Sequence, residues 1–228
     1  MSDSHALTVN DPASEHALQH HFADLEQQKQ SSTLGMWLFL VTEIMFFGAL
    51  IAAYLIYRMA YPDAWQTGGA HMDFWLGTVN TVVLLCSSFT MVVAVWAAQT
   101  GNRRLLVMFL IITMILGIGF EGFKGLEYFR HFEEGSLPGP YWHLDVANPF
   151  RVQMFFLIYF IMTGVHAIHL AIGIVLLGVL AWFSHKGKYS ANYYTPIENA
   201  GLYWHFVDIV WVFLYPLLYL IAHHHAGG

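Results

Sequence analysis

Residues 152–183, VQMFFLIYFIMTGVHAIHLAIGIVLLGVLAWF, form an apolar run without a single acidic or basic side chain apart from histidine. A helix needs roughly 20 such residues to cross the hydrocarbon core of a bilayer, which is about 30 Å thick. Four further apolar runs lie at residues 34–57, 74–98, 105–129 and 202–222. None of them alternates between apolar and polar residues as the strands of a membrane barrel do. The pattern predicts an all-α fold, an integral membrane bundle of five transmembrane helices.

The composition supports a membrane protein. Of the 228 residues, 57% are hydrophobic and only 11% are charged. Soluble domains average about 25% charged residues, so a protein of this composition cannot present water-facing surface all around. The net charge of −6 argues against nucleic acid as a partner. The single cysteine, Cys86, excludes a disulfide framework and a cysteine-based zinc site.

Polar segments flank the membrane part of the chain. Residues 1–33 are polar and acidic overall, and they lack the basic start and short apolar core of a secretory signal, so we expect a solvent-side tail. Residues 34–222 form the predicted transmembrane domain, and residues 223–228 form a short polar C-terminal tail. Turn-forming residues predict connections at 61–69, 101–102, 135–149 and 186–196.

The distribution of basic residues predicts the orientation of the bundle. An odd number of spans puts the two termini on opposite sides of the membrane. The side of the N-terminus carries Lys29, Arg103, Arg104, Lys186 and Lys188, whereas the other side carries Arg58, Arg130 and Arg151. Since cytoplasmic loops are enriched in Lys and Arg, we expect a cytoplasmic N-terminus and a periplasmic or external C-terminus.

Aromatic residues gather at the ends of the apolar runs. Trp and Tyr prefer the membrane–water interface, and the chain places there Tyr57, Tyr61, Trp65, Trp75, Trp96, Tyr141, Trp142, Trp182, Tyr203, Trp204 and Tyr219. The pattern predicts aromatic belts at both interfaces.

Small and polar residues recur at intervals of three and four within each predicted helix. Examples are Gly117, Glu121, Lys124 and Tyr128 in the third run, and Tyr159, Thr163, His166 and Gly173 in the fourth. Residues at this spacing share one face of a helix, and such stripes let membrane helices approach closely and form hydrogen bonds with each other. The stripes therefore predict one packed bundle.

Glu43 is the first polar residue to consider, because it lies near the middle of the first run. A carboxylate at that depth is costly when charged, so it needs a partner or a proton. Two interpretations stay open: an acid that handles protons or faces lipid, and a neutral acid that holds two helices together by a hydrogen bond.

Two other groups of ionisable residues have helical spacing. Glu121, Lys124 and Glu127 lie three residues apart, so a local ion pair can neutralise Lys124. His205 and Asp208 are also three apart, and the carboxylate can accept a hydrogen bond from the imidazole. A structural polar network is the favoured interpretation of both groups.

The histidines within the runs raise the question of a metal or haem. His166 and His169 lie three apart and, with His205, are the histidines inside the predicted spans. Two of them could share a metal, but a six-coordinate haem takes its two axial rings from opposite sides, normally from different helices. The favoured interpretation is that this chain binds no metal or haem and that all three histidines belong to the polar network.

Several of these segments together resemble the subunit III family of haem-copper oxidases. The resemblance rests on Glu198-Asn-Ala-Gly-Leu-Tyr-Trp-His-Phe-Val-Asp-Ile-Val-Trp-Val-Phe-Leu-Tyr215, on Thr163-Gly-Val-His-Ala-Ile-His-Leu-Ala-Ile-Gly173, on Trp37 to Phe47, on Asn80 to Ser88, and on the pair Glu127-Tyr128. The order and spacing of these motifs are similar to the family's across about residues 34–222. The chain resembles the five-helix bacterial form.

The resemblance implies a function. The resemblance implies a non-redox accessory subunit of a proton-translocating terminal oxidase in the respiratory chain, of the aa3 cytochrome c oxidase type, in a bacterial inner membrane. Haem and copper belong to partner chains, the catalytic subunit I and the copper-bearing subunit II. The resemblance further implies bound phospholipid, support for proton uptake, and a role for Glu43 as the family's intramembrane glutamate. Lys186 and Lys188 correspond to basic residues near lipid headgroups.

Alternatives remain within and outside the family. A quinol oxidase subunit III and an accessory subunit of nitric oxide reductase share the same resemblance, because the electron donor docks on other subunits. A self-contained proton-coupled transporter would use Glu43, Lys124, Glu127 and Asp208 as a relay, but transporters usually show internal repeats and broken helices. A haem-carrying membrane cytochrome would use the three intramembrane histidines.

Overall fold

The computed structural model describes residues 22, 24–146, 148–191 and 193–220, and within these ranges the protein is a helical bundle without strands. Five helices there are long and apolar enough to cross a membrane. They are α2 (Leu25–Ala60), α4 (Phe74–Gln99), α5 (Arg103–Glu133), α6 (Pro149–His185) and α7 (Thr195–Tyr215), which continues as a π-helical turn, η1 (Pro216–Leu220). The predicted fold class is confirmed. Most of the predicted N-terminal tail and all of the C-terminal tail lie outside the described residues.

The first transmembrane helix begins earlier than the predicted run. α2 starts at Leu25, inside the segment predicted as a tail, because Asp24 caps it: its Oδ1 accepts a hydrogen bond from the Gln27 backbone N–H at 2.7 Å. The hydropathy pattern marks only the apolar part of a helix and not a polar turn that continues it.

A short helix, α3 (Pro62–Ala70), occupies part of the connection predicted at residues 61–69. Pro62 stands in the first turn of α3, where its missing N–H costs nothing. Trp65 anchors α3 in the bundle, with its ring centre 5.9 Å from that of Tyr54 on α2 and 5.6 Å from that of Phe155 on α6.

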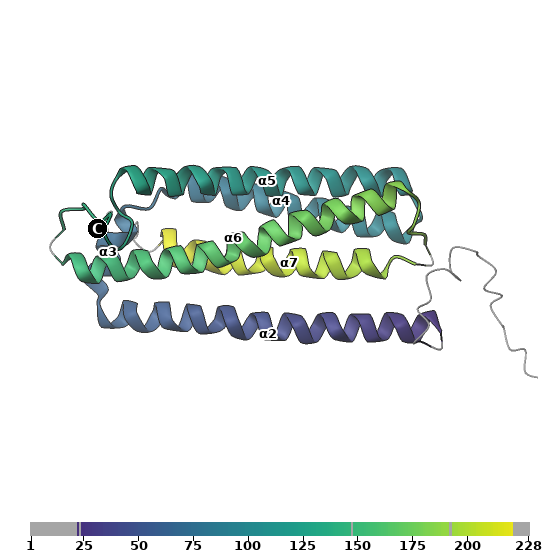
Figure 1. The fold of residues 1–228 in the computed structure, drawn as a ribbon, viewed down its shortest axis with the longest axis horizontal. Helices are drawn as coiled ribbons and strands as arrows, with labels where there is room; N and C mark the ends of the chain where they lie inside the picture. The colour runs from purple at the N-terminus through teal and green to yellow at the C-terminus, as the bar shows by residue number, and fades with distance from the viewer. Residues whose placement is uncertain (1–21, 23, 147, 192, 221–228) are drawn as a thin grey trace, which may run out of the picture.

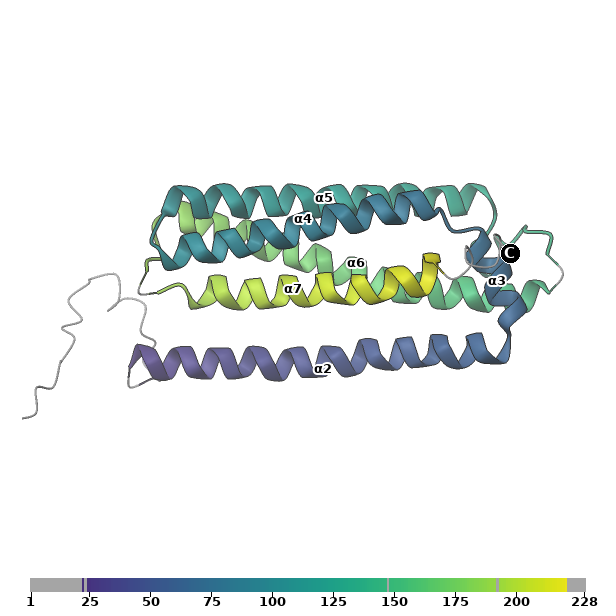
Figure 2. The same cartoon turned by 180° about the vertical axis from the view of Figure 1, so that it is seen from behind.

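The five long helices run antiparallel to their chain neighbours, and the bundle is elongated along them (Figure 1). α4 packs along α5, while α7 contacts α4, α6 and α2. α2 lies at the edge of the bundle, where it packs mainly against α7 and α6, and most of its outward-facing residues are exposed (Figure 2). This helix therefore offers much apolar surface to lipid or to another protein.

The two ends of the bundle carry different connections. The start of α2, the tight α4–α5 turn and the α6–α7 loop lie at one end, and α3 and the loop after α5 lie at the other (Figure 1). In the tight turn, Gly101 adopts a φ of +71°, which favours glycine, and Asn102 caps α5 by accepting from the Leu105 N–H.

Trp204 of α7 is the buried residue on which three helices converge. Its indole fills space left by two glycines: a methyl group on Gly117 of α5 would lie 2.8 Å from Cη2, and one on Gly173 of α6 would lie 3.1 Å from Cε3. Its Nε1 donates a hydrogen bond to Ser87 Oγ of α4 at 3.2 Å. The small-residue stripes predicted on these helices thus serve close packing around one large ring.

The predicted aromatic belts are only partly present. Trp75, Trp96 and Trp182 are exposed, as interfacial residues are expected to be. In contrast, four residues are buried in the bundle, so the prediction is wrong for them: Trp65, Tyr203, Trp204 and Tyr219. Aromatic residues at the end of an apolar run can equally pack inward, and the run itself does not distinguish the two cases.

Replacing Gly117 with Leu is expected to destabilise the bundle by about 1–3 kcal/mol, because the added side chain collides with the Trp204 ring. The matched control is Gly119→Leu on the same helix, where nothing lies within 4 Å of an added Cβ. Thermal unfolding in detergent micelles measures both variants. Equal unfolding temperatures for the two would contradict the role given to Trp204.

Candidate functional site

Glu43 of α2 and His169 of α6 meet within the membrane part of the bundle. Glu43 Oε2 lies 3.1 Å from His169 Nε2, and the two side chains are 18% and 17% exposed. The sequence analysis singled out both residues but did not pair them. The structure therefore brings the intramembrane acid of the first span against a histidine of the fourth, at the edge of the bundle.

The hydrogen bonds of His169 determine where protons reside. His169 Nδ1 lies 2.8 Å from the Val165 carbonyl oxygen, which can only accept, so Nδ1 carries a proton. The contact between Nε2 and Glu43 then needs one further proton, on the carboxyl group or on the imidazole. The pair thus shares one proton between two groups and is neutral overall in either arrangement, which makes it compatible with the membrane interior.

Two neighbours hold His169 in place. Tyr203 of α7 donates its hydroxyl to the His169 carbonyl oxygen at 2.8 Å. The ring of Phe47, one turn after Glu43, meets the imidazole edge-on with ring centres 5.3 Å apart. Through these contacts the Glu43–His169 pair ties α2 to both of the helices against which it packs.

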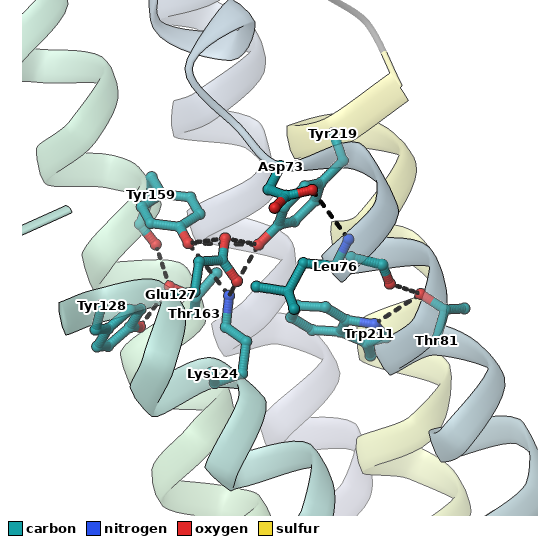
Figure 3. A network of polar contacts seen from close by, with 11 residues as sticks. Asp73, Leu76, Thr81, Lys124, Glu127, Tyr128, Tyr159, Thr163, Trp211 and Tyr219 are labelled. Atoms are coloured by element: carbon teal, nitrogen blue, oxygen red, sulfur yellow. Dashed lines mark hydrogen bonds and ion pairs between the residues drawn. The ribbon is translucent and has the colours of Figure 1, made fainter. Parts of the chain in front are cut away.

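A second polar cluster is fully buried between α5, α6 and η1 (Figure 3). Lys124 Nζ donates to Glu127 Oε2 at 2.9 Å, to Tyr219 Oη at 2.8 Å and to Tyr159 Oη at 3.2 Å. Both tyrosine hydroxyls in turn donate to Glu127 Oε1, at 2.6 Å for Tyr159 and 2.5 Å for Tyr219. All three protons of the ammonium group and both carboxylate oxygens are thereby engaged.

Aromatic rings surround the same ammonium group. Lys124 Nζ lies between 5.1 and 5.5 Å from the ring centres of Tyr128, Tyr159, Trp211 and Tyr219. A cation over aromatic faces is stabilised further where water is excluded. Because every hydrogen-bonding group of the ion pair has a partner and the pair is enclosed, we interpret this cluster as structural and not as a proton-transfer site. We call it the Lys124–Glu127 cluster.

Residues around the Lys124–Glu127 cluster form further hydrogen bonds between neighbouring helices. Tyr128 Oη of α5 and Thr163 Oγ1 of α6 share a hydrogen bond of 2.6 Å, and Trp211 Nε1 of α7 donates to Thr81 Oγ1 of α4 at 3.1 Å (Figure 3). Tyr219 is the residue whose role the sequence analysis missed. Its position, beyond the end of the regular α7 helix, gave no signal that it would reach Glu127.

Three predicted members of the polar network have other surroundings than expected. Glu121 makes no ion pair with Lys124, and its Oε1 is buried without a hydrogen-bond partner among the described residues. His205 Nδ1 is bonded to Ser88 Oγ at 2.8 Å instead of to Asp208. The buried Asp208 carboxyl group lies near Ser88 and forms no hydrogen bond with His205. Residues three apart on a helix lie near each other, but a partner on a facing helix can take the hydrogen bond.

His166 is enclosed by rings. Its imidazole packs 5.1 Å from the Trp211 ring and 5.7 Å from the Phe120 ring, and neither nitrogen has a hydrogen-bond partner in the described ranges. His166, His169 and His205 thus have three separate environments. Among the described residues, no group of three or more His, Cys, Asp or Glu side chains is arranged to hold a metal ion.

Lys186 and Lys188 lie at the end of the bundle where α2 begins. Both are exposed, and their ammonium groups lie over the rings of Trp182, at 4.7 Å, and Phe183, at 4.5 Å. Side chains of this kind keep the charge near the interface while their stems cover apolar surface.

Replacing Lys124 with Met is expected to destabilise the bundle by about 3–5 kcal/mol, because Glu127 would remain as an unpaired buried charge. The double variant Lys124→Met with Glu127→Leu is expected to recover part of this loss. Arg130→Met is the control, since it breaks an exposed ion pair with Asp73 that contributes at most about 1 kcal/mol. Chemical unfolding in detergent measures the free energy of unfolding of all three variants. A loss no larger for Lys124→Met than for Arg130→Met would contradict the structural role of the Lys124–Glu127 cluster.

Comparison with known proteins identifies the family of this chain. A family model described as cytochrome c oxidase subunit III matches residues 6–223. The cytochrome c oxidase subunit 3 of Thermostichus vulcanus is 32% identical over 190 residues, which are 83% of this chain and 87% of that protein. The subunit of the same name from Synechocystis is 35% identical over 189 residues, 82% of this chain and 74% of the relative.

A relative named as a quinol oxidase subunit is similar to about the same degree. The probable quinol oxidase subunit 3 of Staphylococcus aureus is 31% identical over 199 residues, 85% of this chain and 90% of the relative. The predicted resemblance is confirmed by the family match across nearly the whole sequence. The chain belongs to the cytochrome c oxidase subunit III family and is thus a non-catalytic membrane subunit of a haem-copper oxidase, an oxidoreductase complex.

Proposed function

We propose that this chain packs on the catalytic subunit I and the copper-bearing subunit II of a proton-translocating cytochrome c oxidase, binds phospholipid, and supports proton uptake during turnover. The observation that carries the proposal is the Glu43–His169 pair, an intramembrane acid held in a neutral, proton-sharing contact at the edge of the bundle. Because α2 is covered on one side only, this edge is available to lipid or to a partner subunit.

The electron donor separates two versions of the proposal. The relatives named cytochrome c oxidase subunit 3 support cytochrome c, and the Staphylococcus aureus relative supports a quinol. The donor site lies on other subunits, so the partner chains decide between the two. We favour cytochrome c, with a quinol oxidase as the second candidate.

We further propose a bacterial inner membrane location with a cytoplasmic N-terminus. Lys29, Arg103, Arg104, Lys186 and Lys188 belong to the elements at one end of the bundle, which supports a cytoplasmic position for that end. Lys186 and Lys188 are candidates for contacts with lipid headgroups there.

Purification in mild detergent from the native membrane tests the assignment. The expected result is a complex that contains haem and a polytopic haem-copper partner, while this chain is colourless after separation. The haem type and the donor-binding partner then distinguish cytochrome c from quinol. Purification of the chain without an oxidase partner, or a Soret band from the separated chain, would overturn the proposal.

Replacing Glu43 with Gln is expected to leave assembly intact and to shorten the turnover lifetime of the oxidase several-fold. Gln keeps a hydrogen bond to His169 but removes the shared proton. Oxygen consumption followed to inactivation, together with proton uptake in vesicles, measures the effect. Glu121→Gln is the control, because it removes an intramembrane carboxyl group that makes no contact with His169.

A paired substitution sharpens this test. If Glu43 and His169 act as one unit, His169→Gln alone and the double variant should give the same lifetime as Glu43→Gln. Unchanged proton uptake and unchanged inactivation in all three would reduce the pair to a packing contact.

A further inference from the structure

The loop that follows α5, called here the α5–α6 loop, is attached to the bundle at one buried histidine. His131 belongs to the last turn of α5 and is 3% exposed, and Ser136, five residues farther on, is fully buried. The backbone N–H and the hydroxyl group of Ser136 both donate to the His131 carbonyl oxygen, at 3.0 and 3.1 Å. Farther along, the His143 N–H donates to the Gly135 carbonyl oxygen at 2.8 Å. These bonds fold the loop back onto the end of α5.

The same hydrogen bonds determine the tautomer of His131. The hydroxyl group of Ser136 gives its single proton to the His131 carbonyl oxygen, so Ser136 Oγ can only accept from the imidazole. His131 Nδ1 lies 3.3 Å from this oxygen and therefore carries the proton of the neutral ring. Nε2 is then the nitrogen without a proton, and a proton taken up at acidic pH must go there.

The surroundings of Nε2 do not accept such a proton. The imidazole lies among the rings of Phe156, Tyr159 and Phe160 on α6, with ring centres 5.6 to 6.0 Å away. Nε2 is buried and has no hydrogen-bond partner in the described part of the chain. An imidazolium in this pocket would bury a positive charge with one N–H group unpaired, which is costly.

The charged groups around His131 do not offset this cost. Glu134 Oε2 lies 3.8 Å from Nδ1, which already carries a proton, and the Glu134 side chain is 55% exposed, so solvent and salt screen it. The carboxylate of Glu127 is already paired with Lys124. The other titratable groups that face the imidazole, neither of them negative at neutral pH, are Tyr159 of α6 and His71 at the end of α3.

A histidine exposed to water behaves differently. A free imidazole takes up a proton as the pH falls through about 6.5. The state in which His131 has left its pocket therefore binds more protons at acidic pH than the state in which it is buried. Because the state that binds more protons gains population as the pH falls, acid favours release of His131.

We infer that His131 makes the α5–α6 loop a pH-sensitive element: the neutral imidazole holds the loop on the bundle, and protonation releases the last turn of α5 and the loop. The inference goes beyond the proposed function and does not depend on it. In the orientation proposed above, the loop lies at the end opposite the cytoplasm, on the side that becomes acidic when protons are translocated outward.

The distance between two spin labels, measured by double electron–electron resonance on the full chain in nanodiscs, tests the inference. One label replaces Tyr141 in the loop and the other replaces Met59 at the end of α2, as Tyr141→Cys and Met59→Cys. Both native side chains are exposed, and Cys86→Ser removes the native thiol. We expect one narrow distance distribution at pH 8 and a second, broad population at pH 5 that disappears when the pH is raised again. The same distribution at both pH values overturns the inference.

Two variants separate His131 from the other histidine of the loop. His131→Phe keeps an aromatic ring in the pocket and the carbonyl oxygen to which Ser136 bonds, but it takes up no proton, so the loop should stay closed at pH 5. His143→Gln is the control, because it removes an exposed histidine and keeps the backbone N–H that bonds to Gly135. A pH response that persists in His131→Phe, or is lost in His143→Gln, overturns the inference.

A third variant keeps the test decisive if His131→Phe holds the loop open at both pH values. Ser136→Ala removes the acceptor of the Nδ1 proton, so the neutral imidazole is held less well and the loop should open at a higher pH. An unchanged midpoint in Ser136→Ala then overturns the inference. Oxidase partners that co-purify with a chain lacking the pH response overturn this inference alone, whereas a pH response in a chain without oxidase partners overturns only the proposed function.

Discussion

Hydrocarbon offers no hydrogen-bond partner, so a charged side chain inside the membrane is costly unless the bundle supplies its partners. This constraint explains the cluster of Lys124, Glu127, Tyr159 and Tyr219, in which every ammonium proton and both carboxylate oxygens are engaged. The cluster joins α5, α6 and η1 and holds the end of the described chain in the core. An unpaired ammonium group at this position would destabilise the bundle. Lys124 is tolerated there because all three of its protons have acceptors.

The same constraint has a different solution at Glu43 and His169. There one proton shared between an acid and an imidazole makes the net charge of the pair zero, and the pair stays partly exposed at the edge of the bundle. The enclosed cluster fits a structural role, whereas the Glu43–His169 pair is partly exposed at the edge of the bundle. We therefore interpret the first cluster as structural and the second as the candidate functional site.

Side-chain packing determines which helices lie close together and where a hollow remains between them. Trp204 fills the space above Gly117 and Gly173, so α5, α6 and α7 approach closely. α2 has no such anchor against α4, and a hollow of about 600 Å³ lies between these two helices and α7. Close packing in one part of the bundle and a hollow in another thus follow from where the small residues stand.

The sequence by itself determined the number of spans, the fold class and the family, because apolar run length and motif order are local properties of the chain. It also identified Glu43, His169, Lys124 and Glu127 as residues in need of partners. It did not determine which partners they find: His205 bonds to Ser88 and not to Asp208, and Tyr219 turns inward to Glu127. Only the tertiary structure decided these pairings, since the rotation and depth of one helix against another depend on the packing of all of them at once.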